Sequence, residues 1–263
     1  MELPLYQIDA FIGDGYAGNP AAVVPLESWP DDAVLQYIAE ENNLSETAFV
    51  AREGRYWRLR WFTPVTEVAL CGHATLATAY TLWQHLGIGG NRVHFITHSG
   101  QLTACRNGER IEIELPEASP VPAPPELAEA VWRALGMRGE TVLSANFPLA
   151  VLESAEQLRR LDPDMNALRR LDAPGLIVTA PGDREGVDFV SRFFAPTVGI
   201  PEDPVTGAAH CALVPYWTDR TGRPELHALQ LSKRGGELFC SQESGEVVLA
   251  GRARTYLEGR IFV

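Results

Sequence analysis

The sequence predicts an α+β protein built from two similar halves. Strand-like alternation of apolar and polar residues occurs with helix-like patterns in both parts of the chain. A proline-rich connection joins these parts, with five prolines from Pro116 to Pro125, too many for a helix or a central strand. The same series of landmarks recurs on either side of it. These observations predict two domains, 1–116 and 117–263, with the last strand able to cross to the first half.

The apolar pattern places the elements in order. In the first half it predicts a helix over about Asp31–Glu41 and strands over Leu3–Ile8, Ala21–Val24, Thr47–Ala51 and Tyr56–Phe62. In the second half it predicts helices over Glu126–Met137 and Asp164–Leu171 and strands over Leu176–Ala180, Asp188–Phe194 and Val247–Ala250. From Val68 to Asn91 the chain has no Asp, Glu, Lys or Arg, but polar residues interrupt its apolar runs. We expect a helix buried in protein on most sides there, not a membrane span.

An internal repeat supports the division into halves. Each half carries an arginine, a proline four residues later, a glutamate, and a glycine that opens an uncharged segment ending at a tryptophan. In chain order these are Arg60, Pro64, Glu67, Gly72 and Trp83, and then Arg192, Pro196, Glu202, Gly207 and Trp217. A Gly-polar-Leu triplet follows the opening glycine after 28 residues in the first half and 29 in the second. The repeat predicts one sheet-and-helix design used twice.

Composition and motifs exclude several functions. The chain has 263 residues, 46% of them hydrophobic, and a formal net charge of −12, which argues against nucleic-acid binding and against attraction to anionic membranes. Four cysteines without a CxxC pair fit a reducing cytoplasm, and the N-terminal residues have no signal-peptide features. Nucleotide-loop, GxSxG and metal-binding histidine spacings are missing. We therefore expect chemistry by carboxyl and imidazole groups, with no cofactor and no metal.

Both predicted central helices begin at a glycine. Gly72 and Gly207 would leave unpaired N–H groups at the positive ends of the helix dipoles. Such ends bind carboxylate or phosphate. If the halves pack about a pseudo-twofold axis, the two helix ends face each other across a cleft between domains. A small anionic metabolite is the expected ligand.

Two polar residues lie beside these glycines. His73 opens the first helix, where the dipole favours a neutral ring able to form one hydrogen bond; a histidine that only caps the helix is the alternative. Asp203 lies in a turn restrained by prolines, and it could either contact a ligand or serve as the N-cap of the second helix.

Two further candidates lie earlier in the chain. Glu46 enters an apolar strand, and a carboxyl group packed against apolar side chains holds a proton as a general acid/base must; placement on the surface is the alternative. Ser45 could hydrogen-bond a substrate or cap locally. Cys71 precedes a helix glycine and could be a reactive thiolate. A two-base epimerase would want a second thiol where the repeat has Thr206, so we favour a buried structural cysteine.

Several motifs together resemble a known family. They are GNPAAVV (Gly18–Val24), NLSETAFV (Asn43–Val50), and the segments Phe62–Ala77 with LCGHAT, Arg192–His210 with EDPVTG, and Leu231–Leu238. Over nearly the whole chain they resemble the PhzF-like phenazine-biosynthesis isomerases. The resemblance implies a diaminopimelate-epimerase-like fold, in which each pseudo-symmetric half has a mixed or antiparallel curved sheet around a central buried helix. It also implies a homodimer.

The resemblance also implies roles for the candidate residues. Glu46 would move a proton between carbons of trans-2,3-dihydro-3-hydroxyanthranilate without a cofactor, while His73 and Asp203 hold and polarise the substrate. The groups binding its carboxylate would be Ser45, Gly72, Gly207 and Ala208. Phenazine-pathway members have serine at the position of Ala208, which keeps the backbone N–H but removes a hydroxyl. The alternatives are an amino-acid racemase or epimerase using Cys71, and a non-catalytic metabolite-binding or scaffold protein.

Overall fold

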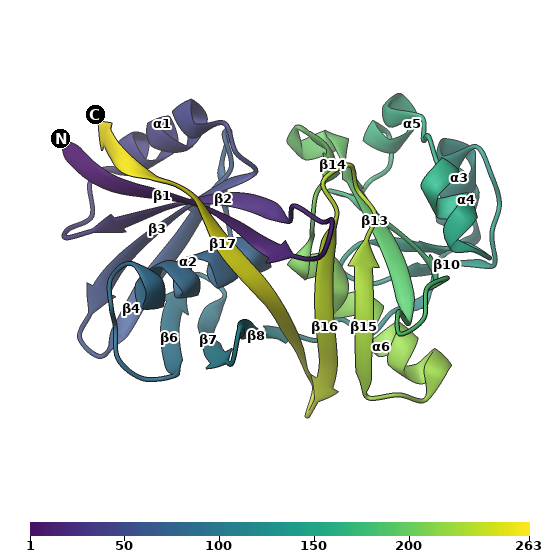
Figure 1. The fold of residues 1–263 in the computed structure, drawn as a ribbon. Helices are drawn as coiled ribbons and strands as arrows, with labels where there is room; N and C mark the ends of the chain where they lie inside the picture. Colours follow the sequence, from purple (N-terminus) through teal and green to yellow (C-terminus); the bar gives the residue numbers. More distant parts are fainter. The chain divides into compact units, whose positions relative to one another are not determined.

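The computed structural model describes all 263 residues (Figure 1). The chain divides into two units, one comprising Met1–Leu115 and Leu249–Val263 and the other Pro116–Val248. The end of the chain returns to the first unit, where β17 (Glu246–Phe262) pairs antiparallel with β1 (Glu2–Ile12). The two termini therefore lie side by side, and the Val263 N–H donates to the Met1 carbonyl oxygen at 2.8 Å.

The first unit is a sheet around one central helix. After β1 its elements are β2 (Asn19–Leu26), α1 (Asp32–Asn42), β3 (Glu46–Glu53), β4 (Tyr56–Phe62), β5 (Glu67–Val68), α2 (Gly72–Gln84), β6 (Arg92–Thr97), β7 (Gly100–Asn107) and β8 (Arg110–Pro116). The pairs β2·β3 and β4·β6 are parallel, and β1·β2, β3·β4, β4·β5, β6·β7 and β7·β8 are antiparallel. Helix α2 packs against β1, β2, β3 and β7, while α1 packs against β3 and β4.

The second unit repeats this order of pairing. Its elements are β9 (Val121–Pro122), α3 (Pro125–Leu135), β10 (Thr141–Ser144), β11 (Pro148–Val151), α4 (Ala155–Arg160), α5 (Met165–Arg169), β12 (Leu176–Pro181), β13 (Phe189–Ala195), a 3₁₀ turn (Pro196–Val198), β14 (Ile200–Asp203), α6 (Gly207–Thr221), β15 (Glu225–Gln230) and β16 (Gly236–Glu243). The pairs β11·β12 and β13·β15 are parallel, as in the first unit, and β10·β11, β12·β13, β13·β14 and β15·β16 are antiparallel. The predicted repeat is confirmed.

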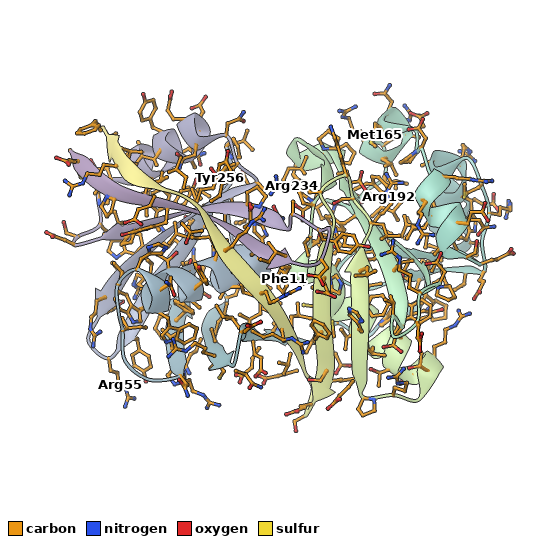
Figure 2. The ribbon with its side chains drawn as sticks, viewed as in Figure 1. Phe11, Arg55, Met165, Arg192, Arg234 and Tyr256 are labelled. Atoms are coloured by element: carbon orange, nitrogen blue, oxygen red, sulfur yellow. The ribbon has the colours of Figure 1, made fainter.

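The repeated arginines make the same ion pair in both units. Arg60 on β4 donates two hydrogen bonds to Glu67, both of 2.7 Å. Arg192 on β13, labelled in Figure 2, donates two to Glu202, of 2.6 and 3.0 Å. Each pair links the long strand to the short strand before the central helix. A bidentate pair of this kind fixes direction as well as distance, so it holds the loop from which the helix begins.

The charge-free helix expected between Val68 and Asn91 is α2. Eleven of its thirteen residues are buried. Its threonine hydroxyls fit this setting because each donates to the carbonyl oxygen four residues earlier: Thr75 at 2.6 Å, Thr78 at 2.7 Å and Thr81 at 2.9 Å. No helix of the structure has the length and apolar character needed to cross a membrane.

Helix α6 has the matching bond at its first turn. His210 occupies the place of Thr75 in the repeat, and its Nδ1 donates to the carbonyl oxygen of Thr206 at 2.8 Å. Burial lowers the pKa of His210 to about 4. Pro215, inside the helix, has no N–H for the Cys211 carbonyl. That oxygen accepts from the Ala118 N–H instead, at 2.9 Å. The carbonyl group that Pro215 leaves without a helical partner thus binds the proline-rich connection to α6.

One expectation about that connection is wrong. We predicted that its prolines exclude a helix, yet Pro125 is the first residue of α3. The first N–H of a helix has no intrahelical acceptor, so proline costs nothing there. The helix ends at Leu135, two residues before the predicted end at Met137, and its C-cap residue Gly136 takes a left-handed φ of 67°.

Candidate active site

Glu46 is the first residue of β3, directly after the half-buried Ser45. Only 14% of its side chain is exposed, so it is not an ordinary surface carboxylate. Because side chains alternate along a strand, Glu46 shares its face with Ala48 and Val50. Phe49, an apolar residue of the same strand, lies on the opposite face in the cluster packed around α1.

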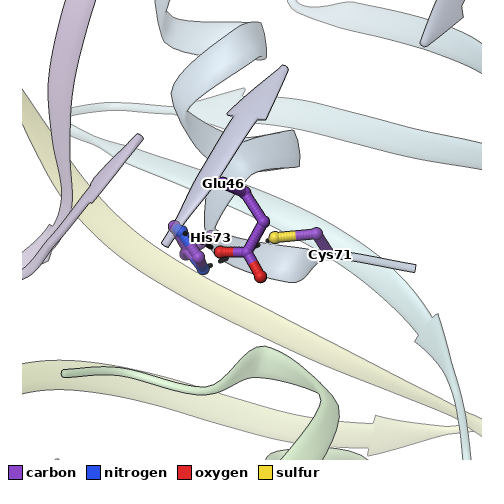
Figure 3. Close-up of side chains that lie close together, drawn as sticks. All are labelled: Glu46, Cys71 and His73. Carbon is purple, nitrogen blue, oxygen red and sulfur yellow. Dashed lines mark hydrogen bonds and ion pairs between the residues drawn. The ribbon is translucent and has the colours of Figure 1, made fainter. Parts of the chain in front are cut away.

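His73 lies beside Glu46, at the second position of α2. Its Nε2 is 3.2 Å from Glu46 Oε2, and its Nδ1 is 3.5 Å from Cys71 Sγ (Figure 3). The same Nδ1 is 3.3 Å from Asn19 Nδ2. The Asn19 amide donates to Nδ1, so the ring proton is on Nε2. The Nε2 atom is buried and makes no hydrogen bond within the chain, because the carboxylate stands off the direction of the N–H. A substrate atom can use this donor.

The ring of His73 is neutral, as predicted, but for a different reason. Burial lowers its pKa from 6.5 to about 3. The helix dipole that we invoked is therefore not the main cause. A neutral imidazole at the start of a helix donates a hydrogen bond without carrying a charge of its own.

Cys71 is the N-cap residue of α2 and is buried, with 5% exposed. Ligand atoms of Cys71, Glu46 and His73 all lie within 4.8 Å of one another, and sulfur, nitrogen and oxygen together suit zinc. The arrangement of the three side chains suits zinc less, because Cys71 Sγ contacts Nδ1 of the His73 ring while the Glu46 carboxylate contacts Nε2. An ion bound to Nε2 and the carboxylate would have the thiol beside the other nitrogen, where Asn19 donates.

Both central helices begin without a side-chain cap. In α2 the N-cap residue Cys71 makes no capping bond, and in α6 Thr206 makes none either. The first backbone bonds in these turns come from Thr75 N–H, at 3.1 Å, and Ala209 N–H, at 3.2 Å. The earlier N–H groups, including those of Gly72 and Gly207, are left for an anion, which fits the predicted use of helix ends.

Asp203 ends β14 and is buried, with 7% exposed. It is not the helix N-cap, since that position belongs to Thr206. Instead Asp203 Oδ2 accepts a 2.5 Å hydrogen bond from the Thr206 hydroxyl. The structure thus gathers the predicted residues in two groups. The first unit holds Ser45, Glu46, Gly72 and His73, and the second unit holds Asp203, Gly207 and Ala208.

Sequence reasoning did not assign a role to Asn19. It is fully buried on β2 and fixes the tautomer of His73. Its signal in the sequence was its place after a glycine in the GNPAAVV motif. In the structure Gly18 has φ +71°, and a Cβ there would lie 2.3 Å from the carbonyl oxygen of Ala10. Any larger residue would push the loop away from β1 and displace Asn19.

Comparisons with known proteins agree with this fold. A family model described as phenazine biosynthesis-like protein matches residues 8–259. A Pseudomonas aeruginosa protein named as an uncharacterized isomerase is 49% identical over 264 residues, covering 99% of each chain. The crystal structure of an Enterococcus faecalis phenazine biosynthesis protein of the PhzF family matches with a TM-score of 0.92 at 42% identity, covering 100% of each chain.

A more distant structure confirms the predicted epimerase-like fold. A hydroxyproline epimerase from Agrobacterium vitis matches with a TM-score of 0.64 at 12% identity, covering 99% of this chain and 92% of that one. At that identity the likeness shows the fold alone. With the family model spanning most of its length, the chain belongs to the PhzC-PhzF family of phenazine biosynthesis-like proteins.

Proposed function

We propose that this protein is a cofactor-independent isomerase that shifts a proton between two carbons of a small carboxylated metabolite, with Glu46 as the general acid/base. One observation carries the proposal. The largely buried Glu46 carboxylate lies 3.2 Å from a neutral His73 whose Nε2 has no hydrogen bond in the chain. A base beside an unused neutral donor suits abstraction of a proton from a carbon next to a π system.

The chemistry needs only one base. Glu46 takes a proton from carbon, and the electron pair left behind spreads over the substrate's π system. The His73 N–H hydrogen-bonds the oxygen or nitrogen where negative charge accumulates. Glu46 then returns the same proton to another carbon on the same face, so it begins and ends as a carboxylate.

Substrate binding uses the helix ends in this proposal. In the first unit the proposed donors to the substrate carboxylate are the N–H groups at Gly72 and the Ser45 hydroxyl. In the second unit they are the N–H groups of Gly207 and Ala208. Asp203 binds a hydroxyl or amino group. The substrate class is trans-2,3-dihydro-3-hydroxyanthranilate or a related small carboxylate. Alanine at position 208 leaves only the backbone as a donor there, so we expect Ala208→Ser to change KM more than kcat.

The geometry disfavours a racemase that pairs Cys71 with Glu46. Two bases on opposite faces of one carbon stand about 6 Å apart or more, since each must approach to about 3 Å. The ligand atoms of Cys71 and Glu46 lie within 4.8 Å of each other. Cys211 offers no substitute, because burial raises the pKa of its thiol to about 12. A one-base isomerase retains activity in Cys71→Ala, whereas a two-base racemase does not.

Glu46→Gln tests the proposal directly. We expect kcat to fall by roughly 10³-fold or more, while binding of trans-2,3-dihydro-3-hydroxyanthranilate persists. The assay follows isomerisation and deuterium uptake from heavy water. Glu53→Gln is the matched control, because Glu53 ends the same strand and is exposed. Full turnover in Glu46→Gln would exclude Glu46 as the base, and no exchange by the wild type with any small carboxylate would favour a binding or scaffold protein.

The assembly and location are also proposals. From the family we propose a homodimer in the cytoplasm. Sedimentation of the purified protein at several concentrations tests the dimer, and fractionation of cells tests the location. A concentration-independent monomer would overturn the former.

A further inference from the structure

A buried glutamine lies behind the Asp203 turn. Gln230 is the last residue of β15 and has no exposed surface. An amide in such a place must find partners for both its oxygen and its nitrogen. Its oxygen accepts from the Thr206 N–H at 2.9 Å. Its nitrogen donates to the Asp203 carbonyl oxygen at 2.9 Å and to the Thr206 hydroxyl at 3.1 Å.

These bonds have only one consistent direction. The Thr206 N–H can only donate and the Asp203 carbonyl can only accept, so they fix which end of the amide is oxygen and which is nitrogen. The Thr206 hydroxyl receives the glutamine N–H and uses its own proton on Asp203 Oδ2, at 2.5 Å. The side chain of Gln230 thus reaches the Asp203 carboxylate through one hydroxyl.

The same bonds affect the start of α6. A threonine at the N-cap ordinarily uses its hydroxyl to accept from a backbone N–H of the first turn. Here that hydroxyl is directed to Asp203, and Thr206 makes no capping bond. The N–H groups of Gly207 and Ala208 consequently remain for a ligand. Ser232 supports the same turn, because its hydroxyl donates to the Pro204 carbonyl oxygen at 2.9 Å.

We propose that Gln230 is a positioning residue: it aims the Asp203 carboxylate, and it keeps the first N–H groups of α6 uncapped for the substrate. The inference rests on the proposed function, since orienting Asp203 affects turnover only if Asp203 binds substrate. Nothing in the sequence pattern marks Gln230, and the strand that it ends was not among those predicted. Its effect on substrate is exerted entirely through Thr206 and Asp203.

The test compares Gln230→Leu with Thr179→Val. Thr179 is equally buried in the same unit and also joins two elements, donating to the Val190 carbonyl and accepting from Trp217 Nε1, but it does not touch the turn. Crystal structures of both variants measure the place of the Asp203 carboxylate. We expect a shift on the order of 1 Å in Gln230→Leu and none in Thr179→Val. With trans-2,3-dihydro-3-hydroxyanthranilate we expect kcat/KM to fall on the order of 10²-fold only in Gln230→Leu.

Gln230→Glu adds a readout that a purely structural role would not move. The carboxyl oxygen still accepts from the Thr206 N–H, so the helix start is retained. An ionised glutamate cannot donate to the Thr206 hydroxyl or to the Asp203 carbonyl, whereas a protonated one can donate its single O–H to one of them. The activity of Gln230→Glu relative to wild type should therefore rise as the pH falls. This variant also serves if Gln230→Leu fails to fold.

The outcomes separate the two proposals. If the wild type does not turn over the test substrate, the proposed function fails for that substrate, while the shift of Asp203 in the crystal structures still decides the role of Gln230. An unmoved Asp203 carboxylate in Gln230→Leu overturns the positioning role. So does a loss of kcat/KM no larger than that of Thr179→Val, or a Gln230→Glu to wild-type activity ratio that does not change with pH.

Discussion

Acid should weaken this fold through two buried histidines, one in each half. Burial lowers the pKa of His73 to about 3 and that of His210 to about 4, both from 6.5. In the unfolded chain both rings gain a proton near pH 6.5, whereas in the folded chain they stay neutral. Between those values the unfolded state binds more protons, so the free energy of unfolding falls as the pH falls.

The size of the effect follows from these values. Between about pH 7.5 and pH 5.0, a group whose pKa is 6.5 unfolded and about 4 folded removes about 2 kcal/mol from the free energy of unfolding. A folded value of about 3 gives nearly the same loss over this range, because both lie well below pH 5.0. The two histidines together should therefore remove about 4 kcal/mol, a large share of the stability of an ordinary domain.

Urea unfolding at the two pH values measures this loss. His210→Asn keeps a side-chain donor near the place of Nδ1 but cannot titrate, so its loss between the two pH values should be about 2 kcal/mol smaller than that of the wild type. His98→Asn is the control, since 55% of the His98 side chain is exposed, and it should behave as the wild type does. Equal losses in His210→Asn and wild type would refute the reasoning, whatever the stability of the variant at pH 7.5.

Three further predictions concern residues that hold the site. Gly18→Ala should lower the free energy of unfolding by about 2–5 kcal/mol, because the added Cβ would lie 2.3 Å from a backbone carbonyl oxygen. Gly15→Ala is the control: Gly15 also has a positive φ, but nothing lies within 4 Å of its Cβ position, so this variant should lose only about 1 kcal/mol. Equal losses of the two variants in urea unfolding would contradict the steric argument. Asn19→Ala should lower kcat without unfolding the protein, because the tautomer of His73 is then no longer fixed. If ¹⁵N spectra of the His73 ring in this variant still show only the Nε2-protonated form, the role given to Asn19 is wrong. Arg192→Met should cost about 3–5 kcal/mol by stranding its partner carboxylate and two carbonyl groups, and a urea midpoint equal to that of the wild type would show the ion pair to be dispensable.

The repeat and the central helices could be read from the sequence because their signals are local. Each depends on a few landmarks at fixed spacing and on a run without charges. Only part of the long last strand, β17, could be predicted from the sequence. We predicted Val247–Ala250, but β17 extends to Phe262. Its later residues are mostly exposed and pair with β1 through the backbone, so they show no apolar alternation.

The contacts within the site could not be predicted in the same way. Asn19 meets His73 across 54 residues, and Gln230 meets Asp203 across 27. Such pairs depend on which strands become neighbours, and one sequence gives no signal for that. The neutral state of His73 was predicted, but its cause was not, since burial of the ring depends on packing of the whole unit.

The register of the repeat shows where the halves differ. Thr47 on β3 pairs with Phe62, which lies two residues after Arg60. Leu176 on β12 pairs with Phe194, which lies two residues after Arg192. Thr47 therefore occupies the same place in the repeat as Leu176. The residues before them, Glu46 and Gly175, also correspond. The counterpart of Glu46 is Gly175, where an added Cβ would lie 2.4 Å from the Phe193 ring.

The residues at matched positions limit how many catalytic bases the two halves could supply. An enzyme with one base in each half would need a group able to take a proton at one of the matched positions of the second unit. The residues matching Glu46, Cys71 and His73 are Gly175, Thr206 and Ala208. None of these side chains accepts a proton near neutral pH. The helix-start hydrogen bonds are kept in both halves, as at Thr75 and His210. At the matched positions only the first half has side chains able to take up a proton, which favours the proposed proton shift on one face over racemisation.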